Sequence, residues 1–392
     1  MSVVRGMSVS GWRSGAGRRW ALLAALSVPM LVGCGQSNSS TPTAPAPTQQ
    51  ATQAAPVTPT PAQGAQEAGT PTVQASATQS GSGAASGAGT FQNPIFQNDF
   101  ADPDVIQVGD TFYAYATNAS GKNIEAAKST NMVQWQLLSD AMPALPSWAQ
   151  LGGSFVWAPS VIQIGQQFVT YYTARDTKSD KQCIGVATSD KPEGKFLDKN
   201  DHAFVCVPDE GGDIDPAPLS DTGKLYLYWK NDGNCCGIPT YIYGQELSQD
   251  GLSLVGKPTR LIENNQSWEG RVVEGPQMFK HDDKYYLFFS AGNYADTTYA
   301  VGYATCDGPL GPCKQADENP ILHSKLEKEP LVIGPGGQSV IQVGDQTWMY
   351  YHVWNEVSGA RGDSRYLWLD RVDWQDGKPQ VKGPTTERQP KP

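Results

Sequence analysis

The sequence predicts an all-β domain, a five-bladed β-propeller, on three observations. One pattern recurs five times: a small or proline-containing opening, a few apolar residues, a turn with Gly or Asp, and an aromatic run. Further strand-like runs lie between the copies, so each repeat holds about four strands. The sequence has no long amphipathic helix pattern, and the nearest candidate, NIEAAKSTNMVQW, is short. Four short strands repeated at a regular interval are typical of propeller blades.

The five copies are evenly spaced. They read ADPDVIQVGDTFYAYAT (101–117), WAPSVIQIGQQFVTYYT (157–173), IDPAPLSDTGKLYLYWK (214–230), EGPQMFKHDDKYYLFFS (274–290) and PGGQSVIQVGDQTWMYY (335–351). The frame prolines are Pro103, Pro159, Pro216 and Pro276, with Gly337 in the fifth place, at intervals of 56, 57, 60 and 61 residues. Each copy predicts a β-hairpin. A stacked solenoid is the alternative, but its terminal repeats would need a polar capping unit that these copies lack.

Residues 1–34 are predicted to be a lipoprotein export signal. Four arginines precede a short apolar run, WALLAALSVPMLV (20–32), which is too short for a comfortable permanent membrane span. The run ends in LVGC (31–34), which resembles the bacterial lipobox. The resemblance implies cleavage before Cys34 and a diacylglycerol thioether on its sulfur. An ordinary cleaved signal with an incidental cysteine is the alternative.

Residues 35–90 are predicted to be a disordered linker. They are rich in Ser, Thr, Pro, Ala, Gln and Gly, with no aromatic residue and one charge, Glu67. Such a segment cannot bury a hydrophobic core. A tether of this length would reach on the order of 40 Å. We therefore expect an exported domain, either secreted or held on the cell surface, which contacts the membrane only through the lipid on Cys34.

Residues 91–392 remain for the propeller, which we expect to be the catalytic domain and monomeric. Removing the signal takes away four arginines and no acids, so the formal charge changes from −10 to −14. An acidic mature protein argues against a nucleic acid partner.

Six cysteines remain after the signal, and an even number in an exported chain predicts disulfides. Fifteen pairings are possible. The preferred set is Cys183–Cys206, Cys306–Cys313 and the vicinal pair Cys235–Cys236. No Cys/His spacing matches a zinc site.

Three of the five openings contain an acid: Asp102, Asp215 and Glu274. The first strand of each propeller blade lines the central channel, so these side chains should face one cavity. Each acid alone is typical of a turn or cap. Three like charges in one cavity are costly, however, which favours a functional role. Several carboxyl groups around a neutral substrate are the requirement of glycoside hydrolysis. Glu274 has the longer reach and is predicted to be the general acid, Asp102 the general base, and Asp215 the group that tunes and orients Glu274.

With these acids in these repeats, the chain resembles glycoside hydrolase family 43, a family of five-bladed propellers. The residues that support the likeness are ADPDV (101–105), WAPSV (157–161), DIDPAP (213–218), VEGPQMF (273–279), GPGGQSV (334–340) and YYHVW (350–354). The likeness covers roughly residues 91–380. It implies an inverting mechanism with the three roles given above. It also implies an oligo- or polysaccharide substrate, in particular the arabinofuranosides and xylosides of plant polysaccharides.

The chain departs from the family pattern in its fifth opening. Many members have His there, as GPGH, often linked to a central metal ion, whereas this chain has Gly337. We therefore predict no metal and no cofactor. His352 is expected either to face the axis and contact substrate or to be a hydrogen-bonded structural residue.

Other residues are weaker candidates for the site. Trp157 could stack on a sugar ring or fill the core. Arg271 and Arg365 could bind sugar hydroxyls or the acids, or be solvated or salt-bridged. Trp229 and Trp268 are expected to be packing or rim residues. Asp104 and Asp213, each two residues from a chosen aspartate, are expected to accept hydrogen bonds at the start of a strand. Asp104 is also the main rival of Asp102 as the base.

The leading hypothesis is an arabinofuranosidase or arabinanase, and the alternative within the same fold is a β-xylosidase. A retaining, fructan-cleaving propeller is disfavoured because the chain lacks an opening like WMNDPNG. A catalytically inactive, carbohydrate-binding propeller lipoprotein is the alternative from another class. The complete set of three acids argues against it.

Overall fold

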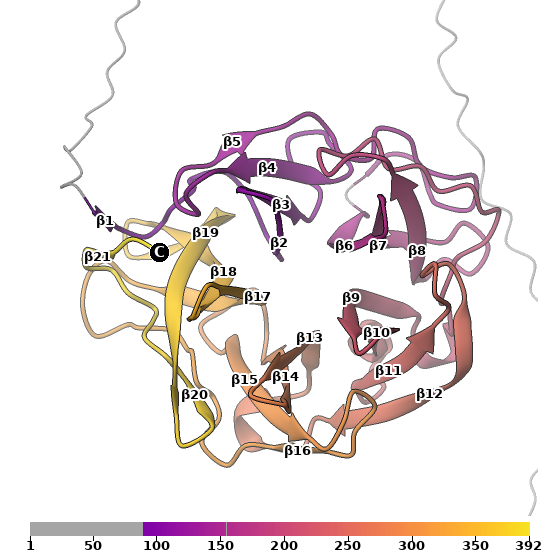
Figure 1. Ribbon diagram of the computed structural model, residues 1–392. Coiled ribbons are helices and arrows are strands. Elements are labelled where there is room, and N and C mark those ends of the chain that lie inside the picture. Colours follow the sequence, from indigo (N-terminus) through magenta and orange to yellow (C-terminus); the bar gives the residue numbers. More distant parts are fainter. Residues whose placement is uncertain (1–88, 154) are drawn as a thin grey trace, which may run out of the picture. The chain divides into compact units, whose positions relative to one another are not determined.

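The computed structural model describes residues 89–153 and 155–392, which form five antiparallel sheets around a central axis (Figure 1). The predicted all-β, five-bladed propeller is confirmed. The predicted export signal with Cys34, and all but the last two residues of the predicted linker, lie outside the described residues. In the described part of the chain, no helix has the length and apolar character that crossing a membrane requires.

The strands of each blade follow one another in the sequence. Blade one contains β2 (Asp104–Val108), β3 (Thr111–Ala116), β4 (Glu125–Ser129) and β5 (Gln136–Leu137); blade two contains β6 (Trp157–Ile164), β7 (Gln167–Arg175) and β8 (Gln182–Ser189). Blade three contains β9 (Asp213–Asp221), β10 (Lys224–Asn231), β11 (Tyr241–Leu247) and β12 (Leu254–Glu263). Blade four contains β13 (Val273–His281), β14 (Lys284–Ala291), β15 (Ala300–Cys306) and β16 (Cys313–Gln315); blade five contains β17 (Ile333–Val343), β18 (Gln346–Val357), β19 (Ala360–Gln375) and β20 (Lys378–Val381).

Blade two departs from the prediction of about four strands per repeat. Its sheet has three strands, and the place of the fourth is taken by isolated antiparallel bridges from β8, Thr188 with Leu197 and Ile184 with Val205. Next to blade five, the two ends of the described chain pair with each other as β1 (Thr90–Phe91) and β21 (Gln389–Pro390). Asn93 joins this pair to β19, because its side-chain oxygen accepts a hydrogen bond from the backbone N–H of Leu369.

The aromatic runs of the sequence form the second strand of each blade, and they are buried on both faces. Each of the five interfaces between blades holds one cluster of buried hydrophobic residues. Successive side chains of a strand point to opposite faces of the sheet. Thus Tyr171 packs toward blade three and Tyr172 toward blade one, while Tyr350 packs toward blade one and Tyr351 toward blade four. A run of adjacent aromatic residues therefore packs against both blades that neighbour its own.

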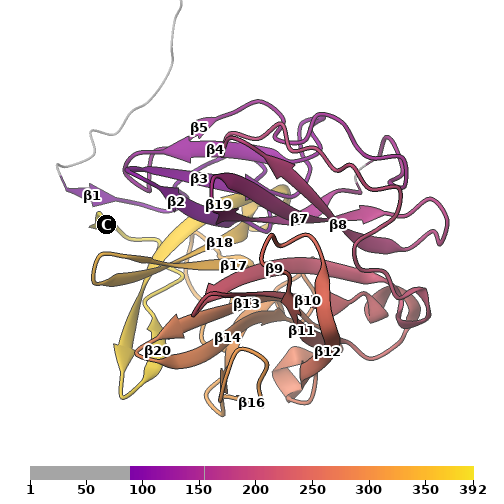
Figure 2. The same cartoon turned by 45° about the vertical axis from the view of Figure 1, so that its right-hand side comes forward.

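The first strands β2, β6, β9, β13 and β17 lie innermost (Figures 1 and 2), and their openings share one backbone device. In blades two to five, two residues of the innermost strand lie opposite one residue of the second strand, which is a β-bulge. The first bulge residue, and its equivalent in blade one, has a positive φ: Asp102 (51°), Ala158 (41°), Asp215 (57°), Gly275 (55°) and Gly337 (57°). This left-handed conformation costs roughly 1 kcal/mol or more for a residue other than glycine, and it re-aims the side chain.

The positions of the bulges change the alignment of the five repeats in two places. The positive-φ residue directly precedes the frame proline in the first four blades, so Gln338 rather than Gly337 occupies the proline position of the fifth. The positive-φ residues are 56, 57, 60 and 62 residues apart. Glu274 precedes its bulge by one residue. It is therefore not the structural equivalent of Asp102 and Asp215, although all three open a blade.

All three predicted disulfides are present. Cys183 of β8 pairs with Cys206 in the loop before β9, and Cys306 of β15 pairs with Cys313 of β16. The vicinal pair Cys235–Cys236 lies in a short 3₁₀ helix, η2 (Gly233–Cys236), between β10 and β11.

Candidate active site

The five openings surround a cavity of about 480 Å³ at one end of the central channel. Five of the seven site residues predicted in the propeller line it: Asp102, Trp157, Asp215, Glu274 and Arg365. The other two do not. Arg271 has an exposed side chain and is not part of the cavity wall, while His352 is fully buried behind Asp102.

A ring of polar residues holds the bulges in place. Each blade carries one such residue opposite the residue that precedes the bulge, in its second strand or, in blade one, directly after it: Thr117, Thr173, Lys230, Ser290 and His352. Four of them accept a hydrogen bond from the bulge N–H of the next blade: Ala158 N to Thr117 Oγ1 at 3.0 Å, Asp215 N to Thr173 Oγ1 at 3.2 Å, Gly337 N to Ser290 Oγ at 2.9 Å, and Asp102 N to His352 Nδ1 at 3.1 Å. The last bond joins blade five to blade one and closes the ring.

Lys230 is the exception in this ring. A lysine ammonium has three donors and no acceptor, so it cannot receive the N–H of Gly275. That N–H donates instead to Asp215 Oδ2 at 3.0 Å. The Lys230 side chain is 0% exposed, and its Nζ donates to Glu274 Oε2 at 2.8 Å and to Asn234 Oδ1 at 2.6 Å. The presence of lysine at this position of the ring therefore has two consequences. The Gly275 N–H is left to orient the Asp215 carboxylate, and the lysine ammonium is the counter-charge of Glu274.

Asp102 is held in its ionised form. The Thr117 hydroxyl donates to Asp102 Oδ2 at 2.6 Å, and Arg365 Nη1 lies 3.3 and 3.4 Å from the two carboxylate oxygens. Burial alone would raise the pKa of Asp102, but the Arg365 guanidinium and the Thr117 hydroxyl outweigh burial and hold this pKa below its ordinary value. Asp102 is thus a carboxylate that can accept a proton at neutral pH.

His352 is a neutral structural residue. Burial and the nearby Arg365 charge lower its pKa to about 3. Its Nδ1 accepts the Asp102 N–H, so the distance of 3.4 Å from Nδ1 to Asp102 Oδ1 is not an ion pair. The ring stacks on Tyr299. Of the two roles expected for His352, the structure supports the hydrogen-bonded structural one.

The residues at the fifth opening do not form a cation site. A Cβ on Gly337 would lie 2.7 Å from Asp102 Oδ1 and from His352 Nδ1, so no larger side chain fits on this backbone. Because Nδ1 of the neutral His352 ring is an acceptor, Nε2 carries the proton and cannot bind a cation. The amide of Gln338 donates to Gly275 O and accepts from Ser290 Oγ.

Asp215 differs from Asp102 in its protonation, because its pKa is raised whereas that of Asp102 is lowered. Burial, and then the charge of Glu274, raise the pKa of Asp215 to about 7, while Lys230 opposes this rise. Asp215 can therefore hold a proton near neutral pH. Burial would lower the pKa of Lys230, but Glu274 and Asp215 outweigh burial and raise it, so the lysine stays charged. The cavity combines the ionised carboxylate of Asp102 on blade one with a group that can hold a proton, Asp215 on blade three, next to Glu274 on blade four.

Asp104 and Asp213, the two aspartates expected to accept hydrogen bonds at strand starts, do so. Asp104 Oδ2 accepts the N–H of Val161 in the next blade at 2.8 Å. Asp213 is buried and accepts from Val207 N at 2.6 Å and from Trp229 Nε1 at 2.9 Å. Burial raises the pKa of Asp104 to about 6 and that of Asp213 to about 7. The prediction of strand-start acceptors is confirmed.

Both tryptophans expected to pack do so. Trp229 is 3% exposed, and Trp268 packs on Phe289.

Sequence reasoning missed several residues of the site. Lys230, Thr117 and Tyr299 surround the acids, and Asp232 and Asn234 line the cavity. A usable signal was present. The aromatic run is followed by one polar residue in every repeat, as in YAT, YYT, YWK, FFS and YYH. Lys230 is the one cation in that series, and it is the polar residue that contacts Glu274.

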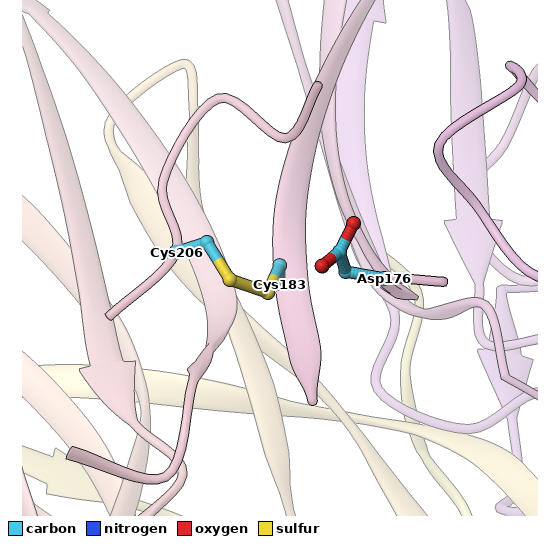
Figure 3. A group of neighbouring side chains, drawn as sticks. All are labelled: Asp176, Cys183 and Cys206. Atoms are coloured by element: carbon cyan, nitrogen blue, oxygen red, sulfur yellow. A yellow bond between two sulfur atoms is a disulfide. The ribbon is translucent and has the colours of Figure 1, made fainter. Parts of the chain in front are cut away.

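One group of side chains outside the cavity has the donors of a metal site. In the described part of the chain, the only three His, Cys, Asp or Glu residues whose donor atoms lie within 4.8 Å of one another are Asp176, Cys183 and Cys206 (Figure 3). Both sulfurs belong to one disulfide, so neither is a thiolate that could bind a metal. The Asp176 carboxylate instead accepts two hydrogen bonds from Ser179, one from the backbone N–H and one from Oγ.

A five-bladed propeller whose axial cavity contains these three carboxylates defines the class of the protein as a glycoside hydrolase. The chain belongs to glycosyl hydrolases family 43, whose family model matches residues 91–379. It is therefore a glycosidase that hydrolyses O-glycosyl compounds.

Individual relatives fall within the same family. A probable arabinan endo-1,5-alpha-L-arabinosidase A from Aspergillus flavus is 27% identical over 303 residues, which cover 71% of this chain and 90% of that protein. A xylan 1,3-beta-xylosidase from a Vibrio species is 26% identical over 282 residues, which cover 67% of this chain and 49% of that protein. The crystal structure of a thermostable family-43 glycoside hydrolase superposes with a TM-score of 0.68 and 32% identity, and the match covers 77% of this chain and 99% of the other.

Proposed function

We propose that the protein hydrolyses α-L-arabinofuranosyl linkages of arabinan-type plant polysaccharides with inversion at the anomeric carbon. The observation on which the proposal rests is the difference in protonation between the carboxyl groups. Arg365 keeps Asp102 ionised, whereas Asp215, beside Glu274, holds a proton near neutral pH. An inverting glycosidase needs such a difference, because one group must accept a proton from water while another donates one to the leaving oxygen.

The proposed reaction is a single displacement. Asp102 takes a proton from a water molecule, whose oxygen attacks the anomeric carbon of the sugar. Glu274 gives a proton to the glycosidic oxygen, and the bond between that oxygen and the anomeric carbon breaks. Asp215 keeps a proton within reach of Glu274. Asp102 and Glu274 come from blades one and four, which are not neighbours, and this suits the separation of roughly 6.5–9.5 Å that admits a water molecule.

The substrate class follows from the relatives. The Aspergillus relative is aligned over nearly its whole length, which favours arabinan. A β-xylosidase is the second candidate, because the Vibrio relative is nearly as similar in sequence over a comparable part of this chain.

We also propose that the protein is exported and anchored through a lipid on Cys34, with a monomeric catalytic domain. Three disulfides in the described residues suit an oxidising compartment.

The test compares an aryl α-L-arabinofuranoside, an aryl β-xyloside and linear arabinan side by side. Asp102→Asn is expected to reduce turnover of all cleaved substrates by about 10²–10⁴-fold, because no other group activates the water. Glu274→Gln is expected to spare aryl substrates with good leaving groups, which need little protonation. Leaving-group dependence in Asp215→Asn instead would exchange the roles of Asp215 and Glu274.

Proton NMR of the first-formed sugar tests the stereochemistry. The anomer opposite to that of the substrate is expected. A retained anomer would imply a covalent intermediate and exclude Asp102 as a base. A wild-type protein that binds saccharides and cleaves none would support the inactive, carbohydrate-binding alternative.

A further inference from the structure

The vicinal disulfide Cys235–Cys236 has a position that chain stabilisation does not explain. A disulfide stabilises a fold mainly by closing a loop in the unfolded chain, and adjacent residues close almost none. The other two disulfides pack within or against the hydrophobic clusters of blade interfaces, whereas neither Cys235 nor Cys236 belongs to any of the five clusters. Both residues are exposed, and Cys235 is part of the cavity wall.

The loop that holds this disulfide is fixed at its base. The Asn231 side chain is buried, donates to Glu210 O and Pro239 O at 3.1 Å each, and accepts from Tyr241 N at 2.7 Å. Ile238 N donates to Gly233 O at 2.9 Å, which closes the loop above that anchor. The covalent bond between neighbouring side chains stiffens the exposed tip further. The tip is therefore a preorganised surface, which loses little conformational entropy when a ligand binds.

The disulfide is also linked to the proposed proton donor. Lys230 Nζ contacts Asn234 Oδ1 at 2.6 Å and Glu274 Oε2 at 2.8 Å. Cys235 directly follows Asn234, so this wall residue lies on the side of the cavity where Glu274 lies. The other cysteine of the pair is contacted by a lysine, because Lys181 Nζ lies 3.0 Å from Cys236 Sγ.

We propose that the Cys235–Cys236 disulfide is a saccharide-binding element, an apolar and polarisable surface against which the apolar face of a sugar ring packs beside Glu274. A sugar ring has polar edges and an apolar face of C–H groups. The carboxylates, Arg365 and Asn234 offer partners for the edges. Sulfur is soft and polarisable and suits the C–H face, as the ring of Trp157 does elsewhere on the wall. This inference rests on the proposed function.

The experiment measures KM and kcat of the full mature chain on a linear α-1,5-arabino-oligosaccharide. The variant is Cys235→Ser with Cys236→Ser, and the matched control is Cys306→Ser with Cys313→Ser, which removes a disulfide outside the cavity. The vicinal variant is expected to raise KM about tenfold, equivalent to about 1.4 kcal/mol, with a smaller change in kcat. The control is expected to lower the melting temperature and leave KM unchanged. Equal KM values in the wild type and a folded vicinal variant would overturn the inference.

A second measurement does not depend on how the variant folds. Dithiothreitol transfers two electrons and two protons to the exposed disulfide, becomes a cyclic disulfide itself and leaves two cysteine thiols. Alkylation and mass mapping identify conditions that reduce only Cys235 and Cys236. In those conditions KM should rise about tenfold and return after reoxidation, and an unchanged KM would contradict the inference. A wild-type enzyme that cleaves neither arabinofuranosides nor xylosides would overturn the proposed function and this inference together.

Discussion

Replacing Lys230 with methionine is expected to move the alkaline limb of the pH profile of kcat/KM upward. The alkaline limb, where activity falls as the pH rises, reports the pKa of the group that must hold a proton during the reaction. The positive charge of Lys230 lowers the pKa of Asp215, which is about 7 in the intact site. Methionine removes that charge at nearly the same volume, so the pKa of Asp215 should rise and the proton should stay in the site at higher pH. The acidic limb should not move, because Asp102 is governed by Arg365.

The magnitude is bounded by the distance from Lys230 to Asp215, because the Lys230 ammonium forms its ion pair with Glu274 and its Nζ lies beyond 4.0 Å from the Asp215 carboxylate. At an effective dielectric constant near 20 and a separation of about 4 Å, Coulomb's law gives about 4 kcal/mol, a ceiling of about 3 pKa units for Asp215. Water entering the cavity and relaxation of the side chains reduce this ceiling, so a shift of about 1–2 pH units is expected. If Glu274 stays ionised without its partner, the free energy of unfolding should fall by about 3–5 kcal/mol.

The assay is a pH profile of kcat/KM on an aryl arabinofuranoside, with the melting temperature of each variant. Lys224→Met is the matched control. Lys224 lies on the same strand, β10, and its Nζ is also 2.8 Å from a glutamate, Glu246, but the pair is exposed to solvent. Exposed pairs contribute little, so this control should leave both limbs in place. An alkaline limb of Lys230→Met that stays in place or moves down would refute the reasoning.

The remaining predictions concern the other side of the cavity and the export signal. Arg365→Gln should raise the pKa of Asp102 and move the acidic limb of the same pH profile upward, so that activity is lost at a higher pH; an unmoved limb would exclude Arg365 as the stabilising charge. Gly337→Ala should cost about 1–3 kcal/mol more in the free energy of unfolding than Gly344→Ala, measured by chemical denaturation, since both glycines have φ near 60° but only the first Cβ would meet Asp102 Oδ1 at 2.7 Å. Equal costs would mean that the fifth opening has room for a side chain. Cys34→Ser should release the protein from membranes into the soluble fraction, and a variant that stays in the membrane pellet would contradict lipid anchoring.

The fold could be predicted from the sequence because local sequence patterns specify its strands and turns. Each blade contributes its own turns and its own aromatic strand, and the buried pairs such as Tyr171–Tyr172 require a neighbour on both faces. A chain with five such strands satisfies that requirement by closing into a ring. The acids could be recognised for a similar reason, since Asp102, Asp215 and Glu274 each lie in the opening of a repeat, although Glu274 precedes the bulge by one residue.

Only the tertiary structure decided what each of these groups does. Hydrogen bonds and charges that reach from one blade to the next are set by separations of about 40–60 or even 250 residues along the chain, which no local pattern encodes. His352 therefore proved to be the acceptor that closes the ring between blades five and one, and Arg271, close to Glu274 in sequence, is exposed and not part of the cavity wall. Lys230 is merely the last residue of the third repeat in the sequence. The fold buries it beside two carboxylates, where it pairs with Glu274 and lowers the pKa of Asp215, because a buried cation acts strongly only on groups within a few ångströms.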